Sequence, residues 1–143
     1  MKKRILMSAA LVLTLASLTG CSSSKTKTLT CTEKNSTGGF DKEEKWVYKF
    51  KDNKITSATL TSTITAGGDY SQYIENYKTD AEKAADSYDK VNGVSAKVSQ
   101  KSNKVTITVK FDTSKMDEAD IDAYKLNEST ESLPTVLEGY TCK

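Results

Sequence analysis

KWVYKFKDNKITSATLTSTITA, residues 45–66, is the stretch that decides the fold. In its first part, Trp46, Tyr48 and Phe50 alternate with residues that are mostly lysines. Asp52-Asn53 then supplies a turn, and the remainder of the stretch alternates apolar residues with threonines. Alternation with a period of two over this length predicts an antiparallel β-hairpin, with one face on the core and the other in water.

The segments on either side of this hairpin predict a further strand and a long helix. Residues 28–32 are rich in β-branched residues and alternate, which favours a strand before the hairpin. After the hairpin, Asp69 is a plausible N-cap for a helix over residues 70–91, which Asn92-Gly93 would end. The apolar residues at helical spacing are Tyr70, Tyr73, Ile74, Tyr77, Ala81, Ala84, Tyr88 and Val91.

A second hairpin follows, with strands over residues 94–98 and 105–111 and a turn at Ser102-Asn103. Residues 117–126 predict a short helix, and the tail from Ser129 predicts an irregular or briefly helical return to the first strand. The expected fold class is therefore α+β. An antiparallel sheet of two hairpins plus an N-terminal strand packs against one long helix and a short C-terminal helix, in a single domain over residues 28–143.

The N-terminal segment indicates export and lipidation. Residues 1–20 combine a basic start with a short apolar run, which is typical of a signal peptide rather than a membrane span. The run ends in Leu18-Thr19-Gly20-Cys21, which resembles the bacterial lipobox. The alternative is an ordinary cleavage site that happens to precede a cysteine. Residues 21–27 would form a short tether.

The lipobox resemblance implies that Cys21 becomes the lipidated first residue of the mature chain. Its thiol would carry diacylglycerol, and two or more acyl chains such as palmitate give stable anchoring where one does not. The expected location is the extracytoplasmic face of the cell membrane, so the membrane is the first expected partner. The chain is thus expected to be a bacterial lipoprotein of the cell envelope.

Cleavage before Cys21 changes the charge balance. The full chain has 21 basic and 19 acidic residues, but the leader holds three of the basic ones, so the mature part has 18 against 19. A net charge of about −1 argues against nucleic acid as a partner and against a polybasic grip on lipid.

The remaining cysteines, Cys31 and Cys142, form an even pair in a chain expected to be exported, where disulfides persist. A bond between them would close nearly the whole domain. The alternatives are two unpaired thiols, or one thiol that pairs with another protein.

The order of elements, together with two short segments, resembles the YehR-like bacterial lipoproteins. The segments are Lys49-Phe50-Lys51-Asp52-Asn53-Lys54 and Phe111-Asp112-Thr113-Ser114-Lys115. The resemblance implies an α+β fold on a lipid anchor. It transfers no functional residues, because the family has no established activity, and Cys31 and Cys142 are not part of its pattern.

The composition disfavours most catalytic chemistry. The chain has no histidine, so histidine-dependent triads cannot form and the commonest metal ligand is missing. Ser22-Ser23-Ser24-Lys25 matches a Ser-x-x-Lys pattern without its companion motifs. The acidic run over residues 117–122 lacks the glycine and final glutamate of a calcium loop and suits a first helical turn. We therefore expect no enzyme activity, no metal and no cofactor.

The tyrosines of the long helix are either core residues or an aromatic platform for a glycan or peptide. If a surface binds a ligand, the candidate is Tyr70 and Tyr73 together with Trp46. The sequence thus predicts a non-enzymatic binding module for an envelope protein, a peptide or a cell-wall component. The alternatives are an inhibitor of a hydrolase and an enzyme that uses two carboxylates on glycans. Glu33, Glu43, Glu44 and Glu75 are available for the latter, although nothing in the sequence pairs them.

Overall fold

The hairpin at residues 45–66 lies at the centre of the structure. A computed structural model describes residues 24–143. The predicted signal peptide and the first three residues of the predicted tether, 21–23, which include Cys21, lie outside the described residues. In chain order the elements are β1 (Thr26–Thr37), β2 (Phe40–Lys51), β3 (Lys54–Ala66), the 3₁₀ helix η1 (Gly68–Tyr73), α1 (Ile74–Tyr88), β4 (Val94–Lys101), β5 (Lys104–Asp112), the 3₁₀ helix η2 (Thr113–Lys115), α2 (Glu118–Ala123), α3 (Leu133–Val136) and β6 (Thr141–Cys142).

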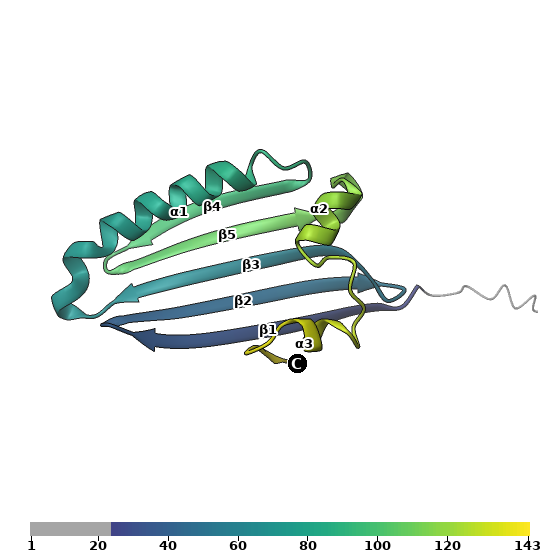
Figure 1. The fold of residues 1–143 in the computed structure, drawn as a ribbon, viewed down its shortest axis with the longest axis horizontal. Helices are drawn as coiled ribbons and strands as arrows, with labels where there is room; N and C mark the ends of the chain where they lie inside the picture. Colours follow the sequence, from purple (N-terminus) through teal and green to yellow (C-terminus); the bar gives the residue numbers. More distant parts are fainter. Residues whose placement is uncertain (1–23) are drawn as a thin grey trace, which may run out of the picture.

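All strands belong to one antiparallel sheet with the order β4-β5-β3-β2-β1-β6 (Figure 1). The predicted turns are present, because Lys51 pairs with Lys54 around Asp52-Asn53, and Lys101 pairs with Lys104 around Ser102-Asn103. The α+β class and the two hairpins are confirmed. β1 begins at Thr26, two residues before the predicted domain boundary, so the sheet includes the end of the predicted tether.

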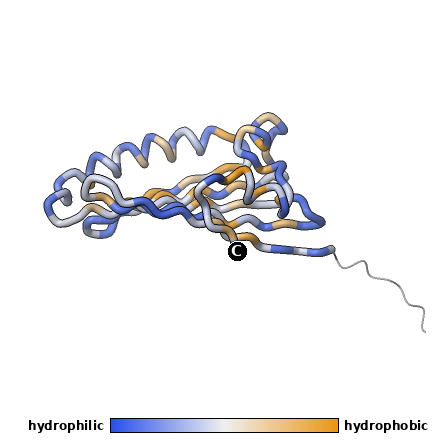
Figure 2. Tube along the Cα trace, turned by 60° about the horizontal axis from the view of Figure 1, so that its bottom comes forward, coloured by the Kyte–Doolittle hydropathy of each residue, from blue (hydrophilic) through white to orange (hydrophobic). Residues whose placement is uncertain are grey.

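The strand register divides the sheet into a core face and an open face. Residues paired directly across antiparallel strands lie on the same face, so Trp46 shares a face with Cys31 and Leu60. We call this side the core face, because its apolar residues form the buried clusters with α1, α2, α3 and the C-terminal tail. Figure 2 shows α1 on one side of the sheet.

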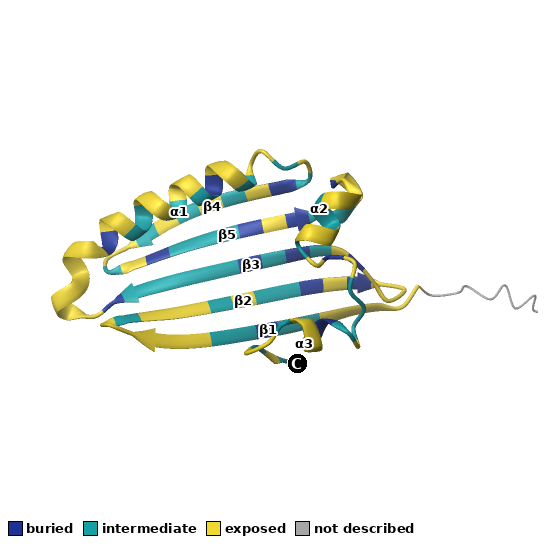
Figure 3. Ribbon diagram, viewed as in Figure 1, coloured by how far each residue is buried: buried dark blue, intermediate teal, exposed yellow. Residues whose placement is uncertain are grey.

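Burial on the core face is uneven along the strands. The main core surrounds Tyr48, Phe50 and Phe111, where α2, α3 and the tail cover the sheet. A smaller cluster of Ala66, Ile74 and Val105 lies under the start of α1. The hairpin end formed by β1 and β2 is exposed, as Figure 3 shows. The strands therefore extend beyond the part of the sheet that the helices cover.

The long helical segment differs from its prediction at both ends. Its first turn is the 3₁₀ helix η1, which Gly67 caps, so Asp69 lies inside that turn and not at the N-cap. α1 then runs from Ile74 and ends at Tyr88, before Asn92-Gly93. Gly93 instead has a φ of +78° and leads directly into β4. Val91, the last residue of the apolar stripe, packs on the core from the turn after α1.

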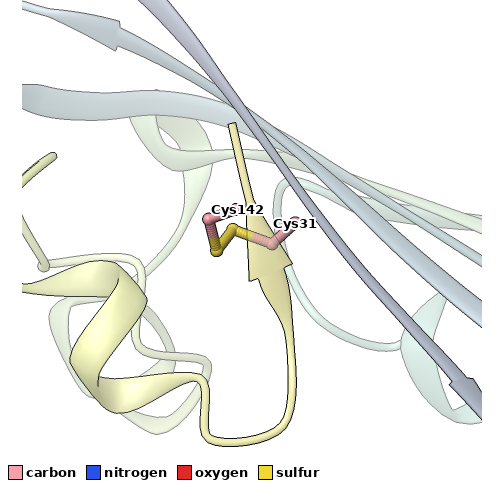
Figure 4. The surroundings of a disulfide bond; sticks show 2 residues. All are labelled: Cys31 and Cys142. Atoms are coloured by element: carbon pink, nitrogen blue, oxygen red, sulfur yellow. A yellow bond between two sulfur atoms is a disulfide. The ribbon is translucent and has the colours of Figure 1, made fainter.

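The tail returns to β1, and Cys31 and Cys142 form a disulfide (Figure 4). The two cysteines are paired across β1 and β6, with their Cα atoms 4.0 Å apart. Cys31 is fully buried. A second contact attaches the tail to the β2–β3 turn, where Asn53 accepts hydrogen bonds from the backbone and hydroxyl of Thr130 and donates one to Glu131.

No helix among residues 24–143 is long and apolar enough to cross a membrane.

Candidate functional site

An aromatic groove lies where the β1–β2 turn meets the start of the helical segment. It has a volume of about 490 Å³ and opens widely to solvent. Its lining residues are Phe40, Tyr70, Tyr73, Asn76, Tyr77 and Asp80. Tyr70 and Tyr73 are 41% and 45% exposed and, with Val136, are the exposed large hydrophobic side chains of the described residues. Apolar side chains with a few polar groups in a concavity of this size are typical of ligand sites.

The local sequence fixes the wall of the groove formed by Phe40 and Tyr70. Gly38 and Gly39 both have a positive φ, of +59° and +84°, and make the tight turn that starts β2 at Phe40. The ring of Tyr70 lies directly on Gly39, where a Cβ atom would be only 2.2 Å from it. The Gly67 N–H donates to the Gly39 carbonyl at 2.7 Å and so joins the two segments.

Helical spacing produces the other wall. Tyr73 and Tyr77 are four residues apart, as are Asn76 and Asp80, so each pair lies on one face of the segment. The ring centroids of Phe40 and Tyr77 are 4.8 Å apart, and those of Phe40 and Tyr70 are 5.5 Å apart. These contacts make one continuous aromatic surface, beside which Asn76 and Asp80 offer an amide and a carboxylate.

The structure brings together only two of the three residues predicted to form a binding surface. Tyr70 and Tyr73 are neighbours, with ring centroids 6.4 Å apart. Trp46 instead stacks on Tyr48 and Phe111 in the main core, with centroid distances of 5.3 and 5.6 Å. Trp46 is therefore a packing residue and does not line the groove.

Sequence reasoning missed Phe40, Asn76 and Asp80. Phe40 could have been found, because an aromatic residue directly after Gly38-Gly39 is typical of a hairpin turn followed by an inward-facing residue. Asn76 and Asp80 carried no signal of their own, since polar residues on a helix are ordinarily solvated.

A polar cluster around Glu44 is the second feature of the core face. One carboxylate oxygen of Glu44 is 2.7 Å from the Lys42 ammonium. The other accepts a hydrogen bond from the hydroxyl of Tyr140. Glu33 is the cross-strand partner of Glu44, and both line a hollow of only about 40 Å³.

The electrostatics of this cluster hold Glu44 ionised. Burial works to raise the pKa of the Glu44 carboxyl, but hydrogen bonds from Lys42 and Tyr140 outweigh it, so the pKa lies below its usual value. Burial, followed by the hydrogen bond to Glu44, raises the pKa of the Tyr140 hydroxyl. The cluster is thus a charge-assisted contact that holds the C-terminal tail against β2.

This geometry does not favour carboxylate catalysis. A glycosidase needs a general acid with a raised pKa and room for a sugar ring between its two carboxyl groups. At Glu44 the pKa is lowered, and the hollow beside Glu33 is too small for a sugar. Within residues 24–143, no three acidic or cysteine side chains gather as a metal site. The acidic residues 117–122 lie instead around the start of α2.

Comparison with known proteins supports the fold alone. No family model matches the sequence, and no curated protein matches it. One solved structure is similar, described as the NMR structure of the protein from Streptococcus pneumoniae TIGR4. The two chains are 16% identical with a TM-score of 0.54, and the alignment covers 100% of this chain and 97% of the other. The overall fold is therefore shared with that protein.

Proposed function

We propose that this chain is a lipid-anchored lipoprotein on the extracytoplasmic face of a bacterial membrane, and that its aromatic groove binds a peptide or saccharide of the cell envelope. The observation that carries the binding function is the pair of exposed tyrosines, Tyr70 and Tyr73, in a groove with Phe40 and Tyr77. Burying four tyrosine and phenylalanine faces against a ligand removes apolar surface from water without ordering long side chains.

The polar residues of the groove suit the same ligands. Asn76 can both donate and accept a hydrogen bond, and Asp80 accepts. Sugar hydroxyls and peptide amides need such partners beside an aromatic surface. Cell-wall fragments carry both kinds of group, so they are the first ligands to test.

The proposed location rests on the leader and the disulfide. The lipobox-like Leu18-Thr19-Gly20-Cys21 lies five residues before β1. The Cys31–Cys142 disulfide is typical of proteins in oxidising compartments outside the cytosol. Membership of the YehR-like lipoproteins is part of the same proposal and implies the same anchor.

Site-specific photocrosslinking and titration test the groove. A photoreactive phenylalanine analogue at Tyr73 should crosslink to a peptidoglycan fragment added to the purified chain. The same analogue at Val136, which is 40% exposed but lies on α3, is the matched control. We expect an adduct at position 73 alone, and at least about a tenfold loss of affinity for the Tyr70→Ala, Tyr73→Ala double variant in calorimetry. Equal crosslinking at both positions would contradict a groove-specific site.

The anchor has its own test. Cys21→Ala should abolish incorporation of radiolabelled palmitate and release the chain from the membrane fraction. Cys142→Ala, which leaves Cys21 in place, is the control and should still be labelled. A Cys21→Ala chain that still incorporates the label and still fractionates with the membrane would refute the lipobox interpretation.

A further inference from the structure

The open face of the sheet is strongly basic. It is the side opposite the core face, and the register assigns to it every second residue of each strand. Its charged residues are nine lysines, Lys34, Lys45, Lys49, Lys51, Lys54, Lys97, Lys101, Lys104 and Lys110, and three acids, Asp41, Glu43 and Asp112. All nine lysines are exposed. The remaining positions are mainly threonines and serines, so the face offers positive charges and hydroxyl groups.

Most of this charge is not neutralised locally. Lys34 forms an ion pair with Glu43 at 3.0 Å, and Asp112 is engaged by Lys115 at 3.0 Å. Within residues 24–143, the other eight lysines of the open face have no ion-pair partner. Asp41 is the remaining acid, and it accepts a hydrogen bond from Ser36 at the rim of the sheet.

The rest of the mature chain has the opposite charge. Outside the open face, residues 21–143 contain nine lysines and 16 acidic residues. The net charge of about −1 therefore conceals two sides of opposite sign, a basic sheet face and an acidic remainder. A molecule charged in this way orients in an electric field and presents its lysines to a negatively charged surface.

The chain enters the sheet beside this face. Thr26 pairs with Lys51, and the Asp52 N–H donates to the Lys25 carbonyl at 3.0 Å. β1 therefore begins next to Lys49, Lys51 and Lys54. Cys21 precedes Thr26 by five residues, which span at most about 18 Å when fully extended. A lipid on Cys21 would hold the lysines within reach of the phosphate groups of the bilayer.

We infer that the open face docks on the anionic phospholipid surface of the membrane, so that the domain lies on its sheet with the aromatic groove held away from the lipid. Anionic lipid attracts basic segments close to the membrane, and each added lysine strengthens binding by about fivefold. A flat array of lysines across the strands matches a planar layer of phosphates better than it matches a single polymer strand. Exposed aromatic rings that would stack on nucleic-acid bases are absent from the described strands of this face. The inference rests on the proposed anchor at Cys21.

Vesicle binding tests the inference without the lipid. The mature chain, residues 21–143 with Cys21→Ser, is mixed with vesicles of phosphatidylcholine alone or with about 30% phosphatidylglycerol, and the bound fraction is measured by sedimentation. We expect at least about tenfold tighter binding to the anionic vesicles. Raising the salt from about 0.1 M to about 1 M, which shortens the Debye length from about 10 to 3 Å, should remove it.

Two triple variants with equal charge change separate the face from the net charge. Lys45→Glu, Lys97→Glu and Lys110→Glu reverse three positions on β2, β4 and β5 and should weaken binding to the anionic vesicles at least about tenfold. The control is Lys78→Glu, Lys83→Glu and Lys90→Glu, on α1 and the turn after it, and should bind within about twofold of the unmodified chain. Thermal unfolding verifies that both variants fold.

Three results would overturn the inference. These are equal binding to both vesicle types, equal loss in the two triple variants, and binding to a soluble polyanion such as heparin without binding to anionic vesicles. The last would assign the face to a polymer. Because the chain in this assay has no lipid, failure here is distinct from failure of the Cys21 labelling test.

Discussion

Breaking the Cys31–Cys142 disulfide should cost a large part of the stability of the domain. The bond joins residues 111 positions apart, and the chain-entropy relation for a loop of that size gives about 4.8 kcal/mol. Domains of this size have a total stability of about 5–15 kcal/mol. At an m value of about 2 kcal/mol per M urea, the loss corresponds to a fall in the unfolding midpoint of about 2.4 M.

Urea unfolding of the oxidised and reduced chain, followed by the fluorescence of Trp46, measures this effect. Trp46 is the single tryptophan of the chain and packs on Tyr48 and Phe111, so its emission reports on the main core. The Cys31→Ala, Cys142→Ala variant should unfold near the reduced chain and should not respond to reductant.

A small effect would refute the reasoning. If the reduced chain unfolds within about 0.5 M urea of the oxidised one, the bond contributes no more than about 1 kcal/mol. The unfolded state would then already hold the two ends together, or the tail would be attached mainly by other contacts, of which Asn53 and Tyr140 are the candidates.

Single contacts give three further predictions. The folded state lowers the pKa of the Glu44 carboxyl, so ionised Glu44 stabilises the fold above its unfolded pKa of about 4.3, and this stabilisation is lost as the pH falls through its folded pKa. The melting temperature of the Glu44→Gln variant should therefore depend less on pH in this range than that of the unmodified chain. An equal pH dependence of the two melting temperatures would contradict the assignment. Gly39→Ala should destabilise the domain more than Gly38→Ala in thermal unfolding. Both variants lose about 1–2 kcal/mol of stability because of the positive φ, but only at Gly39 does a Cβ atom collide with the Tyr70 ring. Equal losses of stability would mean that the Tyr70 ring moves freely. Leu133→Ala, at a fully buried position, should lower the free energy of unfolding by about 2–5 kcal/mol. Val136→Ala, at an exposed position on the same helix, should change it by no more than about 0.5 kcal/mol in urea unfolding. Similar losses of stability in the two variants would show that α3 is not anchored through Leu133.

The alternation of apolar and polar residues along the strands was sufficient to predict most of the fold. Trp46, Tyr48 and Phe50 were predicted to share a face, and they do, because a period of two leaves a half-buried strand no other arrangement. The same alternation placed Trp46 on the core face, but only the structure shows that Trp46 stacks on Tyr48 and Phe111, whereas Phe40 on the same face lines the groove. Strand lengths were underestimated, since the ends of β1 and β2 are polar and extend past the helices that cover the sheet.

The start of the helical segment shows where the sequence signal ends. Asp69 is a good N-cap by composition, but the tight joint between Gly67 and Gly39 imposes a 3₁₀ turn there. That joint is a contact between residues far apart in the chain, and it places the ring of Tyr70 on Gly39. The groove was therefore visible in the sequence only as two tyrosines of a stripe, of which the later members are at least half-buried.

Net charge was the least informative property of the chain. The balance of 18 basic and 19 acidic residues argued against electrostatic binding to lipid. That balance is misleading because it averages the charge over both sides of the molecule. Within each hairpin, the register of β2 with β3 and of β4 with β5 separates lysines from apolar residues, and both registers follow from hairpin turns that were already predicted. A charge count taken separately for each strand face finds the basic surface from the sequence alone.

The two-residue strand β6 also covers part of the outer edge of the sheet. It covers Cys31 and Thr32 of β1, and the disulfide fastens it there. If β6 detached on reduction, the backbone groups of Cys31 and Thr32 would be unpaired at this edge, where the strand of another molecule could pair with them. If the chain is exported as proposed, oxidation outside the cytosol would close this part of the edge. Export would then affect the solubility of the domain as well as its location, because Thr141 and Cys142 would be held on β1 only after oxidation.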